Sequence, residues 1–215
     1  MTKRRPASPS KPLRRNVAVR QPKKTLQIFC EGERTEPEYL LALKREPEVR
    51  DVSAVDLQVE LGSTGSVPMT LVNLAVEAIR NSDGEVDEVW CVFDVEWPQN
   101  HPNLVEACDK ARRHGIRLAI SNPCFELWLV LHHREQSAWL DNDPARRLRR
   151  SIDGQDDKGV DPSRYIPHRS VAAERARRLA DRHSVNETAF PQDNPSSTMF
   201  ELIDSVSPKD EKGSR

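Results

Sequence analysis

Two short apolar runs that end abruptly in acidic residues constrain the fold of this chain more than any other feature. Residues 28–30 lead directly into Glu31, and residues 89–93 lead directly into Asp94, with Glu96 two positions later. Both runs are rich in residues that favour β-strands. A strand that stops at an acid places a carboxylate at the edge of a sheet, where α/β proteins hold their ligands. The alternative interpretation is that these acids serve only solubility.

Up to about residue 134, the chain alternates between predicted strands and helices. Strands are expected at 25–30, 55–61, 88–93 and 116–120, and helices at 35–45, 68–81, 102–114 and 123–133. This alternation favours βαβ units and a mostly parallel sheet flanked by helices. Thr35 and Glu38 have the spacing of a capping box at the start of the first helix. Asn122 is expected to cap the helix that begins at Pro123.

The composition changes after residue 134 to basic, amphipathic segments. Helices are predicted at 144–150, 171–183 and 196–206, so residues 135–207 should form a C-terminal helical lobe after a core at 24–134. The last helix should dock on the core with Met199, Phe200 and Ile203 buried. Residues 208–215 should be frayed.

The N-terminal segment is strongly basic. Residues 1–24 hold nine Lys and Arg and no acid, although the net charge of the whole chain is -1. Interspersed prolines prevent a continuous helix, so residues 1–23 should be a disordered basic tail. Such arms often bind nucleic-acid phosphates, and a merely solubilising extension is the alternative. The candidates for phosphate contacts are Arg14, Arg15, Lys23, Lys24, Lys158 and Arg169.

The composition also bears on location. No apolar run approaches the roughly 20 residues of a membrane helix, and the N-terminus lacks the apolar core of a signal peptide. We therefore expect a cytoplasmic protein with no membrane partner. The four cysteines form no CxxC pair, so they predict buried thiols rather than a zinc site or a disulfide framework.

The clustered acids predict a site for a divalent cation. Asp94 and Glu96 should point to the same side of an extended segment and reach one ion. Gly32 after Glu31 permits close approach of the backbone. Mg²⁺ and Mn²⁺ prefer oxygen ligands, so Glu31, Asp94 and Glu96 are the expected metal ligands. Glu126, in the first turn of an apolar helix, joins them as a catalytic candidate, although a first-turn Glu also suits the helix dipole. The roles of Glu33, Glu36, His132 and His133 stay open.

Four stretches of the chain resemble the RloB-like family, a branch of the Toprim-fold proteins associated with bacterial antiphage and abortive-infection loci. The stretches are residues 30–37, 93–96, 121–132 and 194–198. The resemblance implies an α/β fold with a Toprim-like parallel sheet. It also implies a Glu after the first strand and an Asp-x-Asp pair after a later strand, which together bind Mg²⁺. Glu31 corresponds to that Glu, and Asp94 with Glu96 to the pair. Glu96 differs from the pattern by one methylene.

Two functions are compatible with these residues. The leading hypothesis is a metal-dependent nuclease in antiphage defence, in which the metal polarises a phosphodiester of DNA or RNA, including tRNA, and activates water. The alternative is a non-catalytic nucleic-acid or ligand sensor that acts with a partner ATPase from the same locus. Because one fold hosts many functions, the resemblance does not decide between them.

Overall fold

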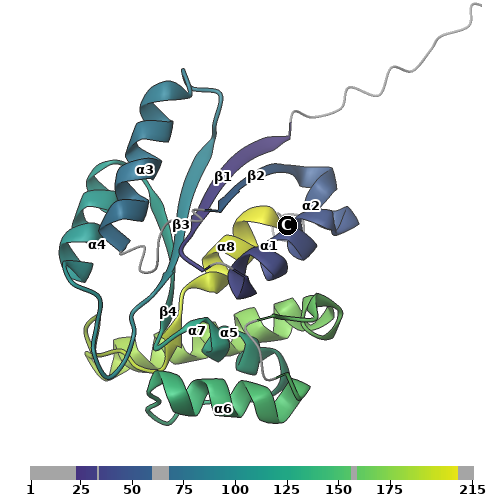
Figure 1. The fold of residues 1–215 in the computed structure, drawn as a ribbon, viewed down its shortest axis with the longest axis vertical. Coiled ribbons are helices and arrows are strands. Elements are labelled where there is room, and N and C mark those ends of the chain that lie inside the picture. Colours follow the sequence, from purple (N-terminus) through teal and green to yellow (C-terminus); the bar gives the residue numbers. More distant parts are fainter. Residues whose placement is uncertain (1–22, 33, 60–67, 156–158, 208–215) are drawn as a thin grey trace, which may run out of the picture.

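The computed structural model describes residues 23–32, 34–59, 68–155 and 159–207, which form a sheet flanked by helices (Figure 1). The sheet has five strands in the order β2-β1-β3-β4-β5. Their bounds are β1 Lys24–Cys30, β2 Ser53–Val59, β3 Glu88–Asp94, β4 Arg117–Asn122 and β5 Ser196–Ser197. The first four strands are parallel, and the short β5 pairs antiparallel to β4. The predicted α/β class, with a mostly parallel sheet and a C-terminal helical extension, is confirmed.

Helices cover both faces of the sheet (Figure 1). Their bounds are α1 Thr35–Arg45, α2 Pro47–Val52, α3 Pro68–Asn81, α4 Leu104–Arg113, α5 Phe125–His133, α6 Asn142–Asp153, α7 Arg169–Val185 and α8 Met199–Val206, with 3₁₀ turns at Pro162–Arg164 and Ile166–His168. The core divides between the two faces: α3 and α4 pack on one, and α1, α5, α7 and α8 on the other. Within β3, Trp90 and Val92 face the second group, whereas Val89, Cys91 and Phe93 face the first. This strand reads as a continuous apolar run because both of its faces are buried.

Several local details differ from the predictions. Strand β2 begins at Ser53, two residues before its expected start. Helix α1 spans the predicted residues 35–45, but its N-cap is Arg34 and not Thr35, so the expected capping box is not formed. The Glu38 carboxylate instead accepts a hydrogen bond from the backbone N of Val160 at 2.8 Å. Asn122 ends β4 and does not cap α5, which begins at Phe125.

The Asn122 side chain is used for contacts with distant parts of the chain. Its Nδ2 donates to the carbonyl of Pro191 and to Oδ1 of Asp193, both at 2.9 Å, and its Oδ1 accepts from Nε1 of Trp97 at 2.8 Å. This buried amide therefore joins the β4 terminus to segments that no local pattern connects to it.

The C-terminal residues 135–207 are part of the same core as the sheet. Residues of α7 and α8 share one hydrophobic cluster with β1 and α1, and β5 extends the sheet. Met199 and Ile203 are buried, as predicted. Phe200 is only partly buried, and its ring lies 5.3 Å from the guanidinium of Arg177. The predicted helix at 196 starts three residues later, because Ser196–Ser197 form β5.

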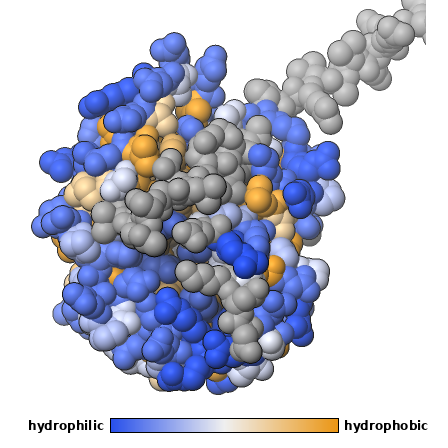
Figure 2. Space-filling view, viewed as in Figure 1, coloured by the Kyte–Doolittle hydropathy of each residue, from blue (hydrophilic) through white to orange (hydrophobic). Residues whose placement is uncertain are grey.

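One face of the molecule and the four cysteines complete the description of the fold. The face shown in Figure 2 is largely hydrophilic, with small, separate hydrophobic areas. Among the described residues, no helix is long and apolar enough to cross a membrane. All four cysteines are free and buried, as their sequence setting predicted.

Candidate functional site

Four of the predicted acids lie at the carboxyl edge of the parallel sheet. Glu31 directly follows β1, Asp94 is the last residue of β3, and Glu126 is in the first turn of α5, shortly after β4. Glu96 lies two residues beyond Asp94. Because β1, β3 and β4 are parallel neighbours, these acids gather at one edge of the sheet, where α/β proteins bind ligands.

Asp94 lies at the centre of this acidic group. Burial raises the pKa of its carboxyl group well above the usual value, and the neighbouring carboxylates of Glu36, Glu126, Glu31 and Glu96 raise it further. Over the described residues, no hydrogen-bond donor and no cation contacts the Asp94 carboxyl group. The site therefore gathers carboxylates around the Asp94 side chain without placing a cation on it.

Glu31 is held in place by its backbone and by a histidine. Its backbone N donates to the carbonyl of Val92 at 3.1 Å, which continues the β1–β3 pairing by one residue. Its Oε2 lies 3.5 Å from the backbone N of Asp94, and its Oε1 lies 3.1 Å from Nε2 of His101. Burial alone would lower the pKa of His101, but the contact with Glu31 and the charges of Glu31 and Glu96 outweigh it and raise that pKa. His101 thus tends to carry a proton beside Glu31.

Glu96 reaches the site by a different route from the predicted one. The extended geometry ends at Asp94, and Glu96 adopts a left-handed backbone conformation with φ of 68°. The expectation that Asp94 and Glu96 project from one extended segment is therefore wrong. The backbone N of Glu96 donates to the carbonyl of Pro123 at 2.9 Å, and the Oε2 of Glu96 accepts from Nδ2 of Asn142 at 2.5 Å. The turn, fixed by β4 and α6, brings Glu96 close enough to raise the pKa of Asp94.

Glu126 and Glu36 come from the first turns of α5 and α1. The side chain of Glu126 is 18% exposed, and its Oε1 lies 3.9 Å from Nε of Arg146 on α6. Glu36 is buried, with its carboxylate directly over Gly32, where any larger side chain would collide with it. Sequence reasoning left the role of Glu36 open, and the structure places it in the acidic group. Its signal in the sequence was an acid in the first turn of the helix that directly follows the acidic loop. Glu33 lies outside the described residues.

The other polar candidates lie away from this group. His132 is buried, its Nδ1 lies 2.8 Å from the carbonyl of Trp128, and its Nε2 lies 3.1 Å from the hydroxyl of Tyr39. Burial chiefly lowers its pKa to about 3, so His132 is a neutral, structural histidine. His133 is exposed and packs edge-on against Tyr165.

The predicted phosphate-binding cations are either engaged elsewhere or not described. Lys24 pairs with Glu88, Arg169 pairs with Glu48, and Lys23 donates to the carbonyl of Arg50. Arg14, Arg15 and Lys158 lie outside the described residues, as do residues 1–22 of the predicted basic tail.

The acidic group fits a hard divalent cation in its chemistry. Five carboxylates supply oxygen ligands, which Mg²⁺ and Mn²⁺ prefer, and their mutual repulsion would be relieved by a cation. In the part of the chain that the structure describes, however, no three His, Cys, Asp or Glu side chains are arranged as a metal site. The outer acids instead contact His101, Asn142 and Arg146. Metal binding would therefore require these side chains to exchange partners.

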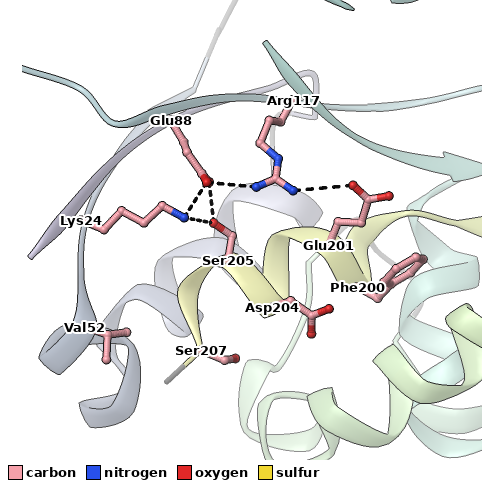
Figure 3. Close-up of a pocket in the computed structure, with 9 residues that line it drawn as sticks. All are labelled: Lys24, Val52, Glu88, Arg117, Phe200, Glu201, Asp204, Ser205 and Ser207. Carbon is pink, nitrogen blue, oxygen red and sulfur yellow. Dashed lines mark hydrogen bonds and ion pairs between the residues drawn. The ribbon is translucent and has the colours of Figure 1, made fainter. Parts of the chain in front are cut away.

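A pocket at the opposite edge of the sheet shows the contrast (Figure 3). It has a volume of about 790 Å³ and lies between the amino ends of β1, β3 and β4 and the helix α8. Here Oε1 of Glu88 lies 2.5 Å from Nζ of Lys24 and 3.0 Å from Nη1 of Arg117. The acids and bases of this pocket neutralise one another, whereas those at the carboxyl edge leave Asp94 unpaired.

The fold and the site together define an α/β protein with a carboxylate cluster at the carboxyl edge of its parallel sheet. Residues 26–206 match the family model described as RloB-like protein, so the chain belongs to the RloB-like family. No curated protein and no solved structure matches the chain.

Proposed function

We propose that this protein is a metal-dependent nuclease that hydrolyses phosphodiester bonds of DNA or RNA at the Asp94 site. The observation that supports this most is the raised pKa of Asp94, which four neighbouring carboxylates cause together with burial. A fold gains no stability from gathering like charges around a partly buried acid, so such an arrangement favours a functional role. The proposed part in bacterial antiphage defence rests on family membership alone.

The proposed ligands are Glu31, Asp94 and Glu96, with Glu126 beside them. A bound Mg²⁺ or Mn²⁺ would polarise the scissile phosphate and lower the pKa of water. Glu36 is buried behind the group and would hold the site negative without leaving its place. Asn142 fixes the Glu96 carboxylate, which limits the positions that this ligand can take.

The pair of Glu31 and His101 is the proposed proton-transfer unit. Nε2 of His101 lies 3.1 Å from Oε1 of Glu31, and the pKa of His101 is raised by this contact. A histidine that holds its proton beside a carboxylate can act as a general acid. With a divalent cation bound, Glu31 would serve as one of its ligands, and His101 would be the residue placed to donate a proton to the leaving oxygen.

The test is a cleavage assay on the purified full chain. Supercoiled plasmid, single-stranded DNA and total tRNA are incubated with Mg²⁺, with Mn²⁺ or with EDTA. We expect cleavage of at least one substrate with metal, none in EDTA, and a loss of at least 100-fold in Asp94→Asn, in the range for removal of one electrostatic catalytic group. The matched control is Glu201→Gln, which removes an exposed acid at the opposite edge and should leave the rate unchanged.

Two results would contradict the proposal. Cleavage that persists in Asp94→Asn would place the reaction elsewhere or in a contaminant. Metal-dependent binding of nucleic acid without any cleavage would favour the sensor that works with a partner ATPase.

A further inference from the structure

One tryptophan is exposed next to the acidic site. Of the four tryptophans, Trp90 and Trp128 are fully buried, Trp97 is partly buried, and Trp139 keeps 49% of its surface exposed. The residues before it, 134–137, are polar, so the exposed aromatic surface here comes from Trp139 and not from an apolar stretch of the chain.

The ring of Trp139 is held in a fixed position. It packs edge-on against Trp97 with ring centroids 4.8 Å apart, and its Nε1 donates to Oδ1 of Asp141 at 3.3 Å. The next residue, Leu140, exchanges two hydrogen bonds with the side chain of Asn194, at 3.1 and 2.7 Å. A ligand that stacks on Trp139 would therefore not have to order the ring first.

The same segment is bound directly to the acidic site. Asn142, three residues after Trp139, donates from Nδ2 to Glu96 and accepts at Oδ1 from the backbone N of Trp97 at 3.0 Å. Its backbone N also donates to the carbonyl of Trp97 at 3.2 Å. One turn further along α6, Arg146 reaches Glu126 and stays 48% exposed. Residues 139–146 thus place an aromatic ring and a guanidinium beside Glu96, a proposed metal ligand, and beside Glu126.

We propose that Trp139 stacks on an unpaired nucleobase of a nucleic-acid strand whose phosphate lies at the Asp94 site. The substrate class is then single-stranded or looped nucleic acid, because the faces of paired bases are covered within a duplex. Arg146 supplies a positive charge for a neighbouring phosphate. The inference rests on the proposed phosphodiester site, but it concerns binding rather than cleavage.

The test compares strands with and without bases. Fluorescein-labelled dT and rU 20-mers, a 20-nucleotide abasic strand and a 20-base-pair duplex are titrated with the full chain in Ca²⁺, and anisotropy is measured. Trp139→Ala should weaken binding of a 20-mer about tenfold, within the range for one stacked base, and change abasic binding less than twofold. Trp139→Phe should keep most of the affinity but lose the quenching of tryptophan fluorescence that the 20-mer causes. Val171→Ala is the control, because it shortens another exposed apolar side chain.

Each other outcome overturns the inference. Equal losses for the 20-mer and the abasic strand would mean that Trp139 acts through folding or charge. If Trp139→Ala binds the 20-mers as tightly as the wild type does, the exposed ring serves another purpose, such as contact with a protein. The same conclusion follows if the wild-type chain binds neither 20-mer. The nuclease proposal is judged separately: base-dependent binding with no metal-dependent cleavage would refute the nuclease and leave Trp139 as a base-stacking residue.

Discussion

Neutralising Asp94 should stabilise the metal-free protein in a pH-dependent way. The pKa of Asp94 is raised in the folded state above its ordinary value of 3.8, so the folded state binds this proton more tightly than the unfolded state. The contribution of the Asp94 carboxyl group to the free energy of unfolding is therefore fully present below about pH 3.8 and is lost as the pH rises through the pKa of the folded state. Asp94→Asn cannot ionise, so its advantage over the wild type should be absent near pH 3.5 and should grow as the pH rises.

The same substitution should remove the stabilisation by metal, and this effect has a predictable size. A ligand at 100 times its Kd that binds only the folded state stabilises it by about 2.7 kcal/mol. For a chain of 215 residues, each kcal/mol shifts the Tm by roughly 2 to 4 °C. Saturating Mn²⁺ should therefore raise the wild-type Tm by about 5 to 10 °C, and Asp94→Asn should lose most of this gain.

Thermal melts followed by circular dichroism measure both effects. The wild type and Asp94→Asn are melted in EDTA from pH 3.5 to 8.5 and then across a Mn²⁺ titration at pH 7.5. The matched control is Asp204→Asn, which breaks the exposed pair with Arg177 and should change stability by less than about 1 kcal/mol without altering the response to metal. A destabilised Asp94→Asn that responds to Mn²⁺ like the wild type would refute the metal-site reasoning.

Two predictions concern the rest of the fold. The pKa of Glu88 is lowered to about 2, because hydrogen bonds from Lys24, Ser205 and Trp90 and the charge of Lys24 outweigh the opposing effect of burial. The stabilisation that ionised Glu88 gives should be present above about pH 4.5 and lost as the pH falls toward 2. Glu88→Gln should therefore cost on the order of 2 kcal/mol at pH 7, and its free energy of unfolding in urea should fall less than that of the wild type as the pH is lowered from 4.5 to 2. The same loss of stability with acid in both proteins would contradict this. Leu202 is fully buried and Phe200 is not, so Leu202→Ala should cost about 2 to 5 kcal/mol in urea denaturation and Phe200→Ala clearly less, and the reverse order would mean that α8 packs differently.

The edge of the sheet that carries the acids was predictable because it depends on local patterns. An apolar run that stops at Glu31 or Asp94 identifies a strand end, and parallel strands bring their carboxyl ends to one edge. Glu126 followed from the helix after the fourth strand in the same way. The positions of these three acids could be predicted from the order of strands and helices alone, and that order is visible in the alternation along the sequence.

The residues that complete the site were not predictable, because tertiary contacts place them. Glu96 reaches the site through a left-handed turn, not through strand alternation. His101 and Asn142 lie in segments without regular periodicity, and each contacts an acid that is distant in the sequence. The exposure of Trp139 depends on how the loop before α6 packs on Trp97, which apolar character alone does not indicate.

The two edges of the sheet give an independent reason to expect a cation at the Asp94 site. At the amino edge, Lys24 and Arg117 come from the first residues of the strands on either side of β3 and neutralise Glu88 between them. The fold thus has a simple way to neutralise an acid at a strand end. At the carboxyl edge, the described cations Arg34, His101 and Arg146 contact Glu38, Glu31 and Glu126, and none of these three contacts Asp94. Because partners are placed around the central acid and none is placed on it, neutralisation of Asp94 must come from a proton or from a bound cation. The raised pKa means that Asp94 keeps its proton to a higher pH than a free aspartic acid, and a divalent ion would displace that proton on binding.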